Sequence, residues 1–179
     1  MASYSIRIVG DPVLAQPTNE VTEIDGRLKK VIDAMFDTLY SSDTGIGLAA
    51  NQVGVQKRLF IYDLEGGDDP QVLINPRITG SDGEWVYAEG CLSIPGLHYD
   101  IVRPKTVEVT AVDLDGNEFS FEADELFSRL IQHEIDHLDG KLMLEHLDDD
   151  QLKDAKRAIR ELQLAREAED RPRSRFSLR

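Results

Sequence analysis

The sequence has few of the features that mark secreted or membrane-bound proteins. Its single cysteine, Cys91, cannot form an internal disulfide, which agrees with a reducing compartment. No apolar run approaches the roughly 20 residues that a membrane-spanning helix needs. The first ten residues lack both the basic and apolar regions of a secretory signal and the arginine-rich character of a transit peptide. We therefore expect a cytoplasmic protein with no membrane partner.

Positive charge is scarce over most of the chain and is concentrated near its end. The 179 residues include 20 lysines and arginines against 34 aspartates and glutamates, a net charge of −14. Residues 151–179 hold nine basic and five acidic side chains, which leaves 11 and 29, or −18, for residues 1–150. Such an acidic body disfavours nucleic-acid binding. The basic end is the part suited to a polyanion, although a solvated helix face explains the same composition.

Apolar spacing predicts an α+β protein of one domain. A helical stripe covers 26–42, short buried strands are expected at 59–64 and 71–75, and Asp115-Gly116 joins 106–114 to 118–121 as a hairpin. Asp124 is placed to cap the next helix and Gly140 to end it. A further helix is expected from about 148 to 168, with a partly flexible tail over 170–179. We expect antiparallel or mixed sheets wrapped around the central helix, and a C-terminal helix outside them.

One glycine-rich segment formally fits a nucleotide-binding pattern but lacks its context. Gly45-Ile46-Gly47-Leu48-Ala49-Ala50 follows a helix and polar residues, whereas the dinucleotide motif needs a buried strand before it and a helix after it. The sequence therefore argues against a nucleotide site. The segment is better read as backbone that a ligand can approach closely.

The most informative stretch is Gln132-His133-Glu134-Ile135-Asp136-His137. Two histidines four residues apart lie above one another on a helix, so both imidazoles can reach one metal ion. Glu134, beside the first histidine, is placed to handle a proton rather than to bind the ion. A chance match on a polar helix is the alternative. The remaining histidines, His98 and His146, have no such neighbours, and surface or structural roles are expected for them.

A catalytic metal commonly has three protein ligands and a water, so one ligand is missing from this helix. Cys91 is the best candidate, in Glu89-Gly90-Cys91-Leu92-Ser93-Ile94-Pro95. The glycine before it permits close approach of an ion or substrate, and the segment is expected to be a shaped loop rather than a strand. A lone cysteine that is merely a small buried hydrophobe is the alternative.

Three segments together resemble the signature motifs of the peptide deformylase family, in the family's order and at similar spacing. They are Gly45–Gln52, Glu89–Ser93 and Gln132–His137, and the resemblance extends over nearly all of residues 4–147. It implies an enzyme that removes the N-formyl group from the formylmethionine of newly made polypeptides and releases formate. It also implies a catalytic region over 1–147, with 148–179 as a helix and basic tail of the same domain.

The resemblance assigns roles to individual residues. Cys91, His133 and His137 would bind one divalent metal, natively Fe(II), with zinc, nickel or cobalt also compatible with one thiolate and two imidazoles. Glu134 would carry a proton from water to the leaving amine. The Gln52 side chain and the Leu92 backbone N–H would stabilise the oxyanion.

The same resemblance implies that substrate binds as an added strand beside Ile46, Gly47 and Gly90. Its methionine would enter an apolar pocket formed by Ile46, Tyr87, Leu126, Arg129 and Leu130. The Arg129 stem is expected to line this pocket while its guanidinium reaches water. Glu89, Arg103 and Asp136 are expected to form a supporting ion-pair cluster, with unpaired surface charges as the alternative.

The implied partners are formylmethionyl nascent peptides and, through the basic C-terminal helix, the ribosome; a monomer is expected.

Two other classes of protein compete with the deformylase interpretation. A metallopeptidase of the HExxH type would cleave internal peptide bonds, but Cys91 precedes the histidines, and the oxyanion and strand-pairing segments fit the deformylase family. A binding module with a structural metal normally has four protein ligands; no second cysteine exists, so His98 or His146 would have to be the fourth.

Overall fold

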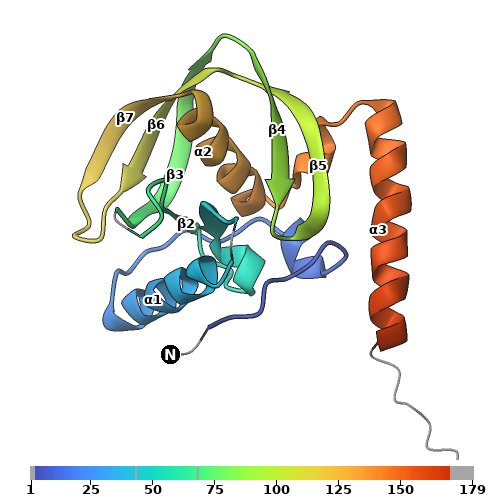
Figure 1. The fold of residues 1–179 in the computed structure, drawn as a ribbon. Coiled ribbons are helices and arrows are strands. Elements are labelled where there is room, and N and C mark those ends of the chain that lie inside the picture. The colour runs from blue at the N-terminus through green and yellow to red at the C-terminus, as the bar shows by residue number, and fades with distance from the viewer. Residues whose placement is uncertain (1–2, 43, 68, 170–179) are drawn as a thin grey trace, which may run out of the picture.

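Two antiparallel sheets and a central helix form the body of the protein (Figure 1). The structure is a computed structural model that describes residues 3–42, 44–67 and 69–169. The larger sheet has the order β1-β2-β3-β6-β7, and the smaller one pairs β4 with β5. The strands are β1 (Gly47–Ala49), β2 (Leu59–Tyr62), β3 (Gln71–Asp82), β4 (Trp85–Cys91), β5 (Ile94–Arg103), β6 (Thr106–Val112) and β7 (Glu118–Asp124). The expected α+β class is confirmed.

Three α-helices accompany the sheets: α1 (Gly26–Tyr40), α2 (Glu125–Leu138) and α3 (Asp149–Glu169). Short 3₁₀ helices are η1 (Pro12–Ala15), η2 (Ala50–Val53) and η3 (Met143–His146). The start of α1 follows from its sequence, since the Asp25 side chain accepts hydrogen bonds from the Arg27 and Leu28 amides and so satisfies two N–H groups of the first turn. No helix in the described ranges is long and apolar enough to cross a membrane.

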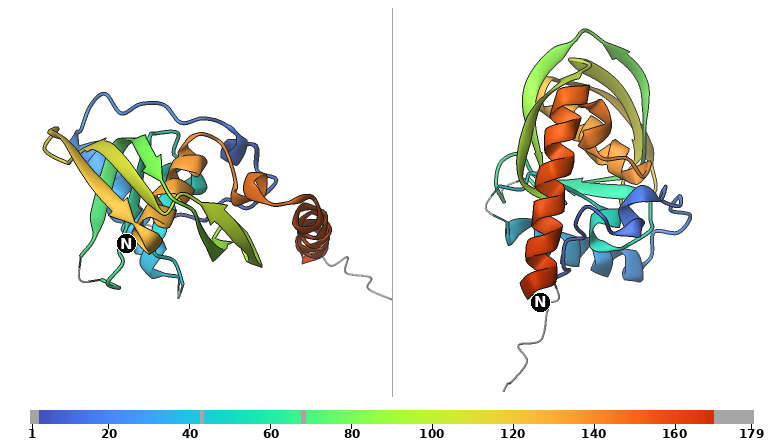
Figure 2. Two further views of the ribbon diagram at one scale, coloured as in Figure 1. Left: turned by 90° about the horizontal axis from the view of Figure 1, so that it is seen from above. Right: turned by 90° about the vertical axis from the view of Figure 1, so that its right-hand side faces the viewer.

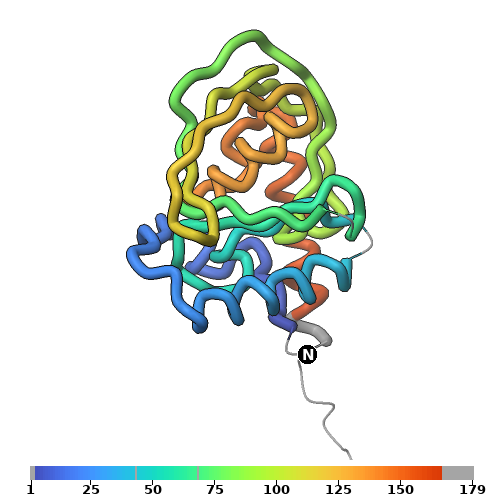
Figure 3. Tube along the Cα trace, turned by 90° about the vertical axis from the view of Figure 1, so that its left-hand side faces the viewer, coloured from blue at the N-terminus to red at the C-terminus, as the bar shows by residue number. Residues whose placement is uncertain are grey.

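Strands β1 and β2 of the larger sheet are buried on both faces, because a helix packs on each side of them. Side chains alternate along β2, so Leu59 and Ile61 join the cluster under α1 while Phe60 joins the cluster under α2. The apolar stripe of α1 is confirmed, with Leu28, Ile32, Met35 and Leu39 buried. Figure 3 shows α1 and α2 on opposite sides of β1 and β2. This packing fixes α2, which carries both histidines, against the strands that flank the site.

The smaller sheet and the C-terminal helix share a third apolar cluster. Ile94 and Ile101 of β5 pack with Met143 and with Ile159 of α3. Figure 2 shows α3 lying along the outside of the molecule, next to β5. The Gln151 side chain donates to the Asp100 carbonyl at 3.1 Å, and Gln163 donates to the Val9 carbonyl at 3.4 Å. The expected tail over 170–179 lies outside the described residues.

Several expected boundaries differ from the structure. The strand predicted at 71–75 continues to Asp82, past Asn75 and Pro76, by means of a register shift between Ile74 and Arg77. The segment around Cys91 was expected to be a loop, but it forms the end of β4 and the tight turn into β5. The predicted hairpin around Asp115-Gly116 is confirmed.

The ends of α2 fall where the sequence places them, although only one is capped as expected. Asp124 occupies the N-cap position without making a side-chain cap hydrogen bond, and Glu125 begins the helix at a φ of 46°. Gly140 follows the last turn at a φ of 74°, a left-handed conformation that favours glycine. A Cβ there would also lie 2.8 Å from the Gln16 carbonyl carbon. The expected stop at Gly140 is confirmed.

Candidate metal centre and its cleft

The three expected metal ligands come together from two elements. His133 and His137 lie one turn apart on α2, with ring centroids 5.0 Å apart. Cys91 ends β4, and its Sγ lies 3.2 Å from His137 Nε2. One ligand atom from each residue lies within 4.8 Å of the other two. This is the only such group of three or more metal-binding side chains within the part of the chain that the structure describes.

The electrostatics of this group favour a bound cation. Burial opposes ionisation of the Cys91 thiol, but the nearby His137 and His133 imidazoles outweigh it and hold the thiol pKa well below its usual value. Burial would also lower the pKa of His133, yet hydrogen bonds with Cys91 and Glu89 raise it well above its usual value. The site therefore stabilises a thiolate and a compensating positive charge. A divalent ion can take the place of that charge, since metal binding displaces protons from its ligands.

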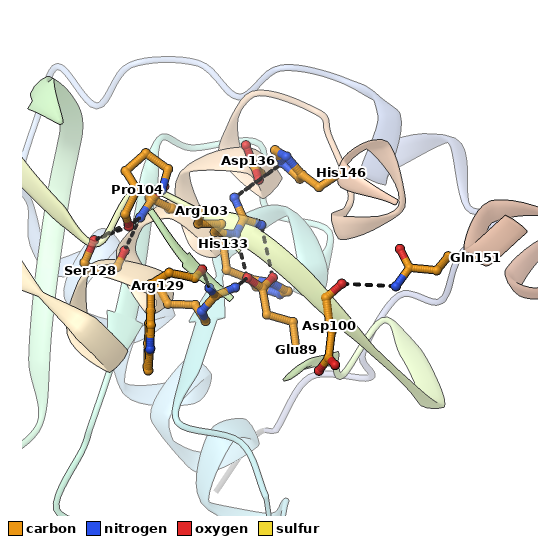
Figure 4. Close-up of polar contacts among 12 residues, drawn as sticks. Glu89, Asp100, Arg103, Pro104, Ser128, Arg129, His133, Asp136, His146 and Gln151 are labelled. Carbon is orange, nitrogen blue, oxygen red and sulfur yellow. Dashed lines mark hydrogen bonds and ion pairs between the residues drawn. The ribbon is translucent and has the colours of Figure 1, made fainter. Parts of the chain in front are cut away.

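Glu89 orients His133, one of the three expected ligands, through the ring nitrogen that would not bind the ion. Its Oε2 lies 3.0 Å from His133 Nδ1, which leaves Nε2 of that ring for an ion. Arg103 binds the same carboxylate with Nε at 2.6 Å and Nη2 at 3.1 Å (Figure 4). Burial alone would raise the pKa of Glu89, but hydrogen bonds from His133 and Arg103 lower it well below its usual value. Glu89 is thus a buried carboxylate that stays charged and fixes the imidazole.

The ion-pair network continues from Glu89 toward the C-terminal segment. Arg103 Nη1 donates to Asp136 Oδ2 at 2.7 Å, and His146 Nε2 lies 2.8 Å from the same oxygen. The expected cluster of Glu89, Arg103 and Asp136 is therefore present. His146 was expected to have a surface or structural role, and its contact joins η3 to α2. The network ties the ligand helix, the smaller sheet and η3 together.

Arg129 does not behave as its sequence position suggests. Its guanidinium was expected to reach water, but the residue is only 3% exposed. Nη1 donates to Glu89 Oε1 at 2.5 Å and Nη2 to the Trp85 carbonyl at 2.6 Å. The expectation of a solvated guanidinium is wrong, because the buried Glu89 carboxylate provides a charged partner that sequence spacing does not reveal. Arg129 nevertheless lines the cleft, as expected.

Glu134 is a buried carboxylate next to the metal ligands. It is 4% exposed, and its Oε2 has no hydrogen-bond partner among the described residues. Burial raises its pKa to about 7, against the opposing influence of His133 and His137. A Cβ at position 47 would lie only 2.6 Å from Glu134 Oε1, so Gly47 leaves the space that this carboxylate occupies. The arrangement suits a group that exchanges a proton near neutral pH.

Gln52 and Ser93 border the ligands on the other side. The Gln52 Oε1 accepts a hydrogen bond from the Ala49 amide at 2.8 Å, which directs Nε2 toward the site. That nitrogen donates to Ser93 Oγ at 3.1 Å and lies 3.8 Å from Cys91 Sγ. Leu92 lies in the turn between β4 and β5. The amide is therefore fixed in place next to the proposed metal position.

A cleft of about 410 Å³ opens onto this group. Its lining includes two of the three ligands, Cys91 and His133, together with Glu134, whereas His137 is buried next to Cys91. All the residues expected to stabilise the oxyanion or to bind substrate also line it: Ile46, Gly47, Gln52, Tyr87, Gly90, Leu92, Leu126, Arg129 and Leu130. The structure thus brings together every site residue that the sequence singles out, although it does not test their roles.

Other lining residues were not found from the sequence, notably Thr44, Ala88, Pro95, Leu97 and His98. His98 pairs with Gly90 across the β4–β5 hairpin, and a Cβ at Gly90 would lie 2.5 Å from His98 Nε2. The imidazole therefore sits against the Gly90 backbone. Sequence reasoning missed it because the hairpin register was not recognised.

Comparison with known proteins agrees with this geometry. The model of the polypeptide deformylase family matches residues 3–153. A peptide deformylase of Clostridium botulinum is 49% identical over 145 residues, which are 81% of this chain and 97% of that relative. One from Agathobacter rectalis is 45% identical over 148 residues, 83% of this chain and 92% of that relative.

Solved structures show the same likeness. A peptide deformylase from Legionella pneumophila has a TM-score of 0.87 at 36% identity, covering 96% of this chain and 100% of that one. The enzyme from Synechococcus elongatus, solved in complex with actinonin, has a TM-score of 0.82 at 43% identity, covering 87% and 86%. With the family match extending over most of its length and the ligand triad in place, this chain belongs to the polypeptide deformylase family.

Proposed function

We propose that the cleft beside Cys91, His133 and His137 is where this enzyme hydrolyses the N-terminal formyl group of newly synthesised polypeptides and releases formate. The chain is a hydrolase of the deformylase family, whose members depend on a metal. One observation carries the assignment to this cleft. Three ligand atoms lie within 4.8 Å of one another beside Glu134, a buried carboxylate whose Oε2 has no hydrogen-bond partner in the part of the chain that the structure describes.

The donor set fits a divalent first-row ion. One thiolate and two imidazoles suit iron, zinc, cobalt or nickel, and we propose Fe(II) as the native ion, in line with the resemblance to the family. When bound, such an ion supplies a Lewis acid that lowers the pKa of water and polarises a carbonyl oxygen. Glu89 would hold His133 in the tautomer that presents Nε2, because Nδ1 is engaged by the carboxylate.

Glu134 would carry the proton that the reaction must move. Hydrolysis breaks the C–N bond of the formyl amide, adds the water oxygen to the formyl carbon and leaves a proton for the departing nitrogen. Burial raises the pKa of this carboxyl group to about 7, so it can both accept and return a proton near neutral pH. The atom available for this transfer is Glu134 Oε2, which no described residue engages in a hydrogen bond.

Gln52 and the Leu92 N–H would stabilise the negative charge that develops on the formyl oxygen. The support for Gln52 is its fixed orientation, with Oε1 held by the Ala49 amide and Nε2 beside the ligand thiol. Donors placed in advance cost no reorganisation at the transition state. Leu92 follows Cys91 directly in the turn, so its amide lies next to the same ligand.

Substrate would bind as an extra strand along the cleft. β1 lies at the edge of the larger sheet, and within the described residues β2 is its one partner strand, so a peptide could pair along its other side beside Ile46 and Gly47. Gly90, on the opposite wall, adds a second backbone contact. The methionine side chain would enter between Tyr87, Leu126, Arg129 and Leu130. Backbone pairing of this kind reads few side chains, which suits an enzyme acting on many new proteins.

The C-terminal segment would belong to the same domain and would meet the ribosome. Ala155 and Ile159 of α3 are buried against the body, which supports a single unit over 1–147 and 148–179. The exposed face of α3 carries Lys153, Lys156, Arg157, Arg160 and Arg166. This charge suits ribosomal RNA, although Arg157 is partly engaged by Asp154 at 3.0 Å. We propose a cytoplasmic monomer that docks through this face.

The activity is tested by measuring formate release from formyl-Met-Ala-Ser by protein loaded with iron without air. Acetyl-Met-Ala-Ser and an internal peptide are the comparison substrates. We expect release of formate only, with no cleavage of the internal peptide. Cleavage of internal bonds would instead indicate a metallopeptidase, and absence of both activities in metal-loaded protein would refute the proposal.

The proposed docking of α3 on the ribosome is tested by cosedimentation of the protein with ribosomes. We expect cosedimentation to be reduced when Lys156 and Arg160 are changed to glutamate.

A further inference from the structure

His146 contacts the ligand helix from outside the cleft. It ends η3, and its Nε2 lies 2.8 Å from Asp136 Oδ2 on α2. An ionised carboxylate only accepts hydrogen bonds, so the imidazole nitrogen is the donor. His146 and Asp136 are both outside the lining of the cleft. This contact therefore does not act on bound substrate directly, and any effect on the site must pass through Asp136.

The Asp136 carboxylate lies at the edge of the buried network and depends on its partners for a fixed position. Its side chain is 17% exposed, whereas that of Arg103 is 3% exposed. Its Oδ2 accepts from Arg103 Nη1 at 2.7 Å as well as from His146 Nε2, and these two nitrogens lie 3.3 Å apart. A carboxylate that reaches water can adopt other rotamers, and a second donor on the same oxygen restricts them. His146 thus helps to fix the oxygen that Arg103 binds.

Arg103 transmits this position to Glu89. Its guanidinium is a rigid plane, so the nitrogens that bind two different carboxylates cannot move independently. Nη1 binds Asp136, while Nε and Nη2 bind Glu89 at 2.6 Å and 3.1 Å (Figure 4). Glu89 Oε2 in turn lies 3.0 Å from His133 Nδ1. An unbroken series of contacts, none longer than 3.1 Å, therefore joins His146 to the expected ligand His133.

We propose that His146 is a positioning residue for the metal centre. It holds Asp136, which fixes the Arg103 guanidinium. Arg103 and Glu89 then keep His133 in the orientation that presents Nε2 to an ion. The inference rests on the proposed ligand role of His133 and adds a distant residue to the support of that site. Because His146 ends η3, the segment that leads into α3 takes part in setting the geometry of the metal centre.

The test compares the cobalt(II) affinity of the wild type with that of His146→Leu and His146→Gln in a chelator competition. Leucine fills a similar space without a donor, whereas the glutamine amide can place its nitrogen near the position of Nε2. Losing a direct partner of a metal ligand costs about 10–100-fold in affinity, and His146 acts through three intervening side chains. We therefore expect His146→Leu to bind cobalt at least about threefold more weakly, with His146→Gln within about twofold of the wild type. A smaller loss in His146→Leu, or a larger one in His146→Gln, overturns the proposal.

A double-mutant comparison shows whether the effect passes through Asp136. In an Asp136→Asn background, His146→Leu should weaken cobalt binding by less than about twofold, since the contact is already altered. A further loss of twofold or more overturns the proposal. The KM of cobalt-saturated His146→Leu for formyl-Met-Ala-Ser should match that of the wild type, because neither residue lines the cleft. A raised KM would indicate a disturbed cleft and would also overturn the proposal.

Gln151→Leu is the matched control, because Gln151 also joins the C-terminal segment to the smaller sheet, through the Asp100 carbonyl at 3.1 Å, but lies outside the series that leads to His133. Its cobalt affinity should equal that of the wild type. If His146→Leu does not fold, the shorter His146→Asn takes its place with the same expected loss, and a smaller loss overturns the proposal. Tight wild-type binding that His146→Leu leaves unchanged overturns this inference alone. A wild type that binds cobalt no more tightly than Cys91→Ala would instead refute the proposed ligand set.

Discussion

Gly47 offers a direct test of the role of Glu134, because adding one methyl group moves the carboxylate without removing it. The Cβ of Gly47→Ala would lie 2.6 Å from Glu134 Oε1 and 3.2 Å from its Cδ, whereas ordinary contact begins at 3.4 Å. The oxygen must therefore move by about 3.4 − 2.6 = 0.8 Å. The backbone of β1 cannot move away easily, because Gly47 pairs with Tyr62 and all three residues of β1 are buried.

A displacement of this size should affect chemistry more than stability. A misplacement of about 1 Å costs roughly 100-fold in rate, and overpacking a buried site costs about 1–3 kcal/mol in the free energy of unfolding. We expect Gly47→Ala to bind metal stoichiometrically and to lose about 100-fold in kcat for formyl-Met-Ala-Ser. Gly26→Ala, where a Cβ meets nothing within 4 Å, is the control and should retain full activity. A Gly47→Ala protein with kcat within threefold of the wild type would refute the placement of Glu134 as the proton carrier.

Three further predictions test the ligands, the proton carrier and the acid stability of the fold. Glu134→Ala should retain its metal and lose at least about 100-fold in kcat, as steady-state assays and metal analysis would show; normal turnover contradicts the mechanism. Cys91→Ala should weaken metal binding by more than about 100-fold in a chelator competition, since loss of even an outer partner costs 10–100-fold; unchanged affinity removes Cys91 from the ligand set. Hydrogen bonds from Tyr40 and from backbone amides lower the pKa of Asp63, so its contribution to stability is present above the unfolded pKa of 3.8 and is lost as pH falls below it. Urea unfolding should therefore show Asp63→Asn less stable than the wild type at pH 7, with the difference shrinking below pH 3.8; a difference that grows on acidification contradicts this assignment.

The features that could be predicted from the sequence depend on local spacing. The stripe of α1, the hairpin at Asp115-Gly116 and the i, i+4 pair of His133 and His137 each follow from the period of one element. Each is present in the structure. Cys91 is joined to this pair by the need for a third ligand, because no local pattern brings together Cys91 and His137, which are 46 positions apart.

The features that were missed depend on contacts between distant segments. Pro76 cannot donate a ladder hydrogen bond, which argues for a strand end, but the register shift beside it lets β3 continue. The sequence does not reveal the partner of Arg129, because Glu89 lies 40 residues earlier, in a segment whose spacing predicts a loop and which forms the end of β4 instead. His98 was overlooked for the same reason, since only the register of β4 and β5 places it against Gly90.

The central claim is that one metal ion is held by a single sulfur and two imidazoles, with a position left open for reaction. X-ray absorption at the metal edge of the anaerobically purified protein tests it most directly. We expect one sulfur ligand at about 2.3 Å and two nitrogen ligands at about 2.0–2.1 Å, distances typical of a tetrahedral site, with the remaining ligand a light atom that azide displaces. A shell without sulfur, or a fourth protein ligand that azide leaves in place, would contradict the account.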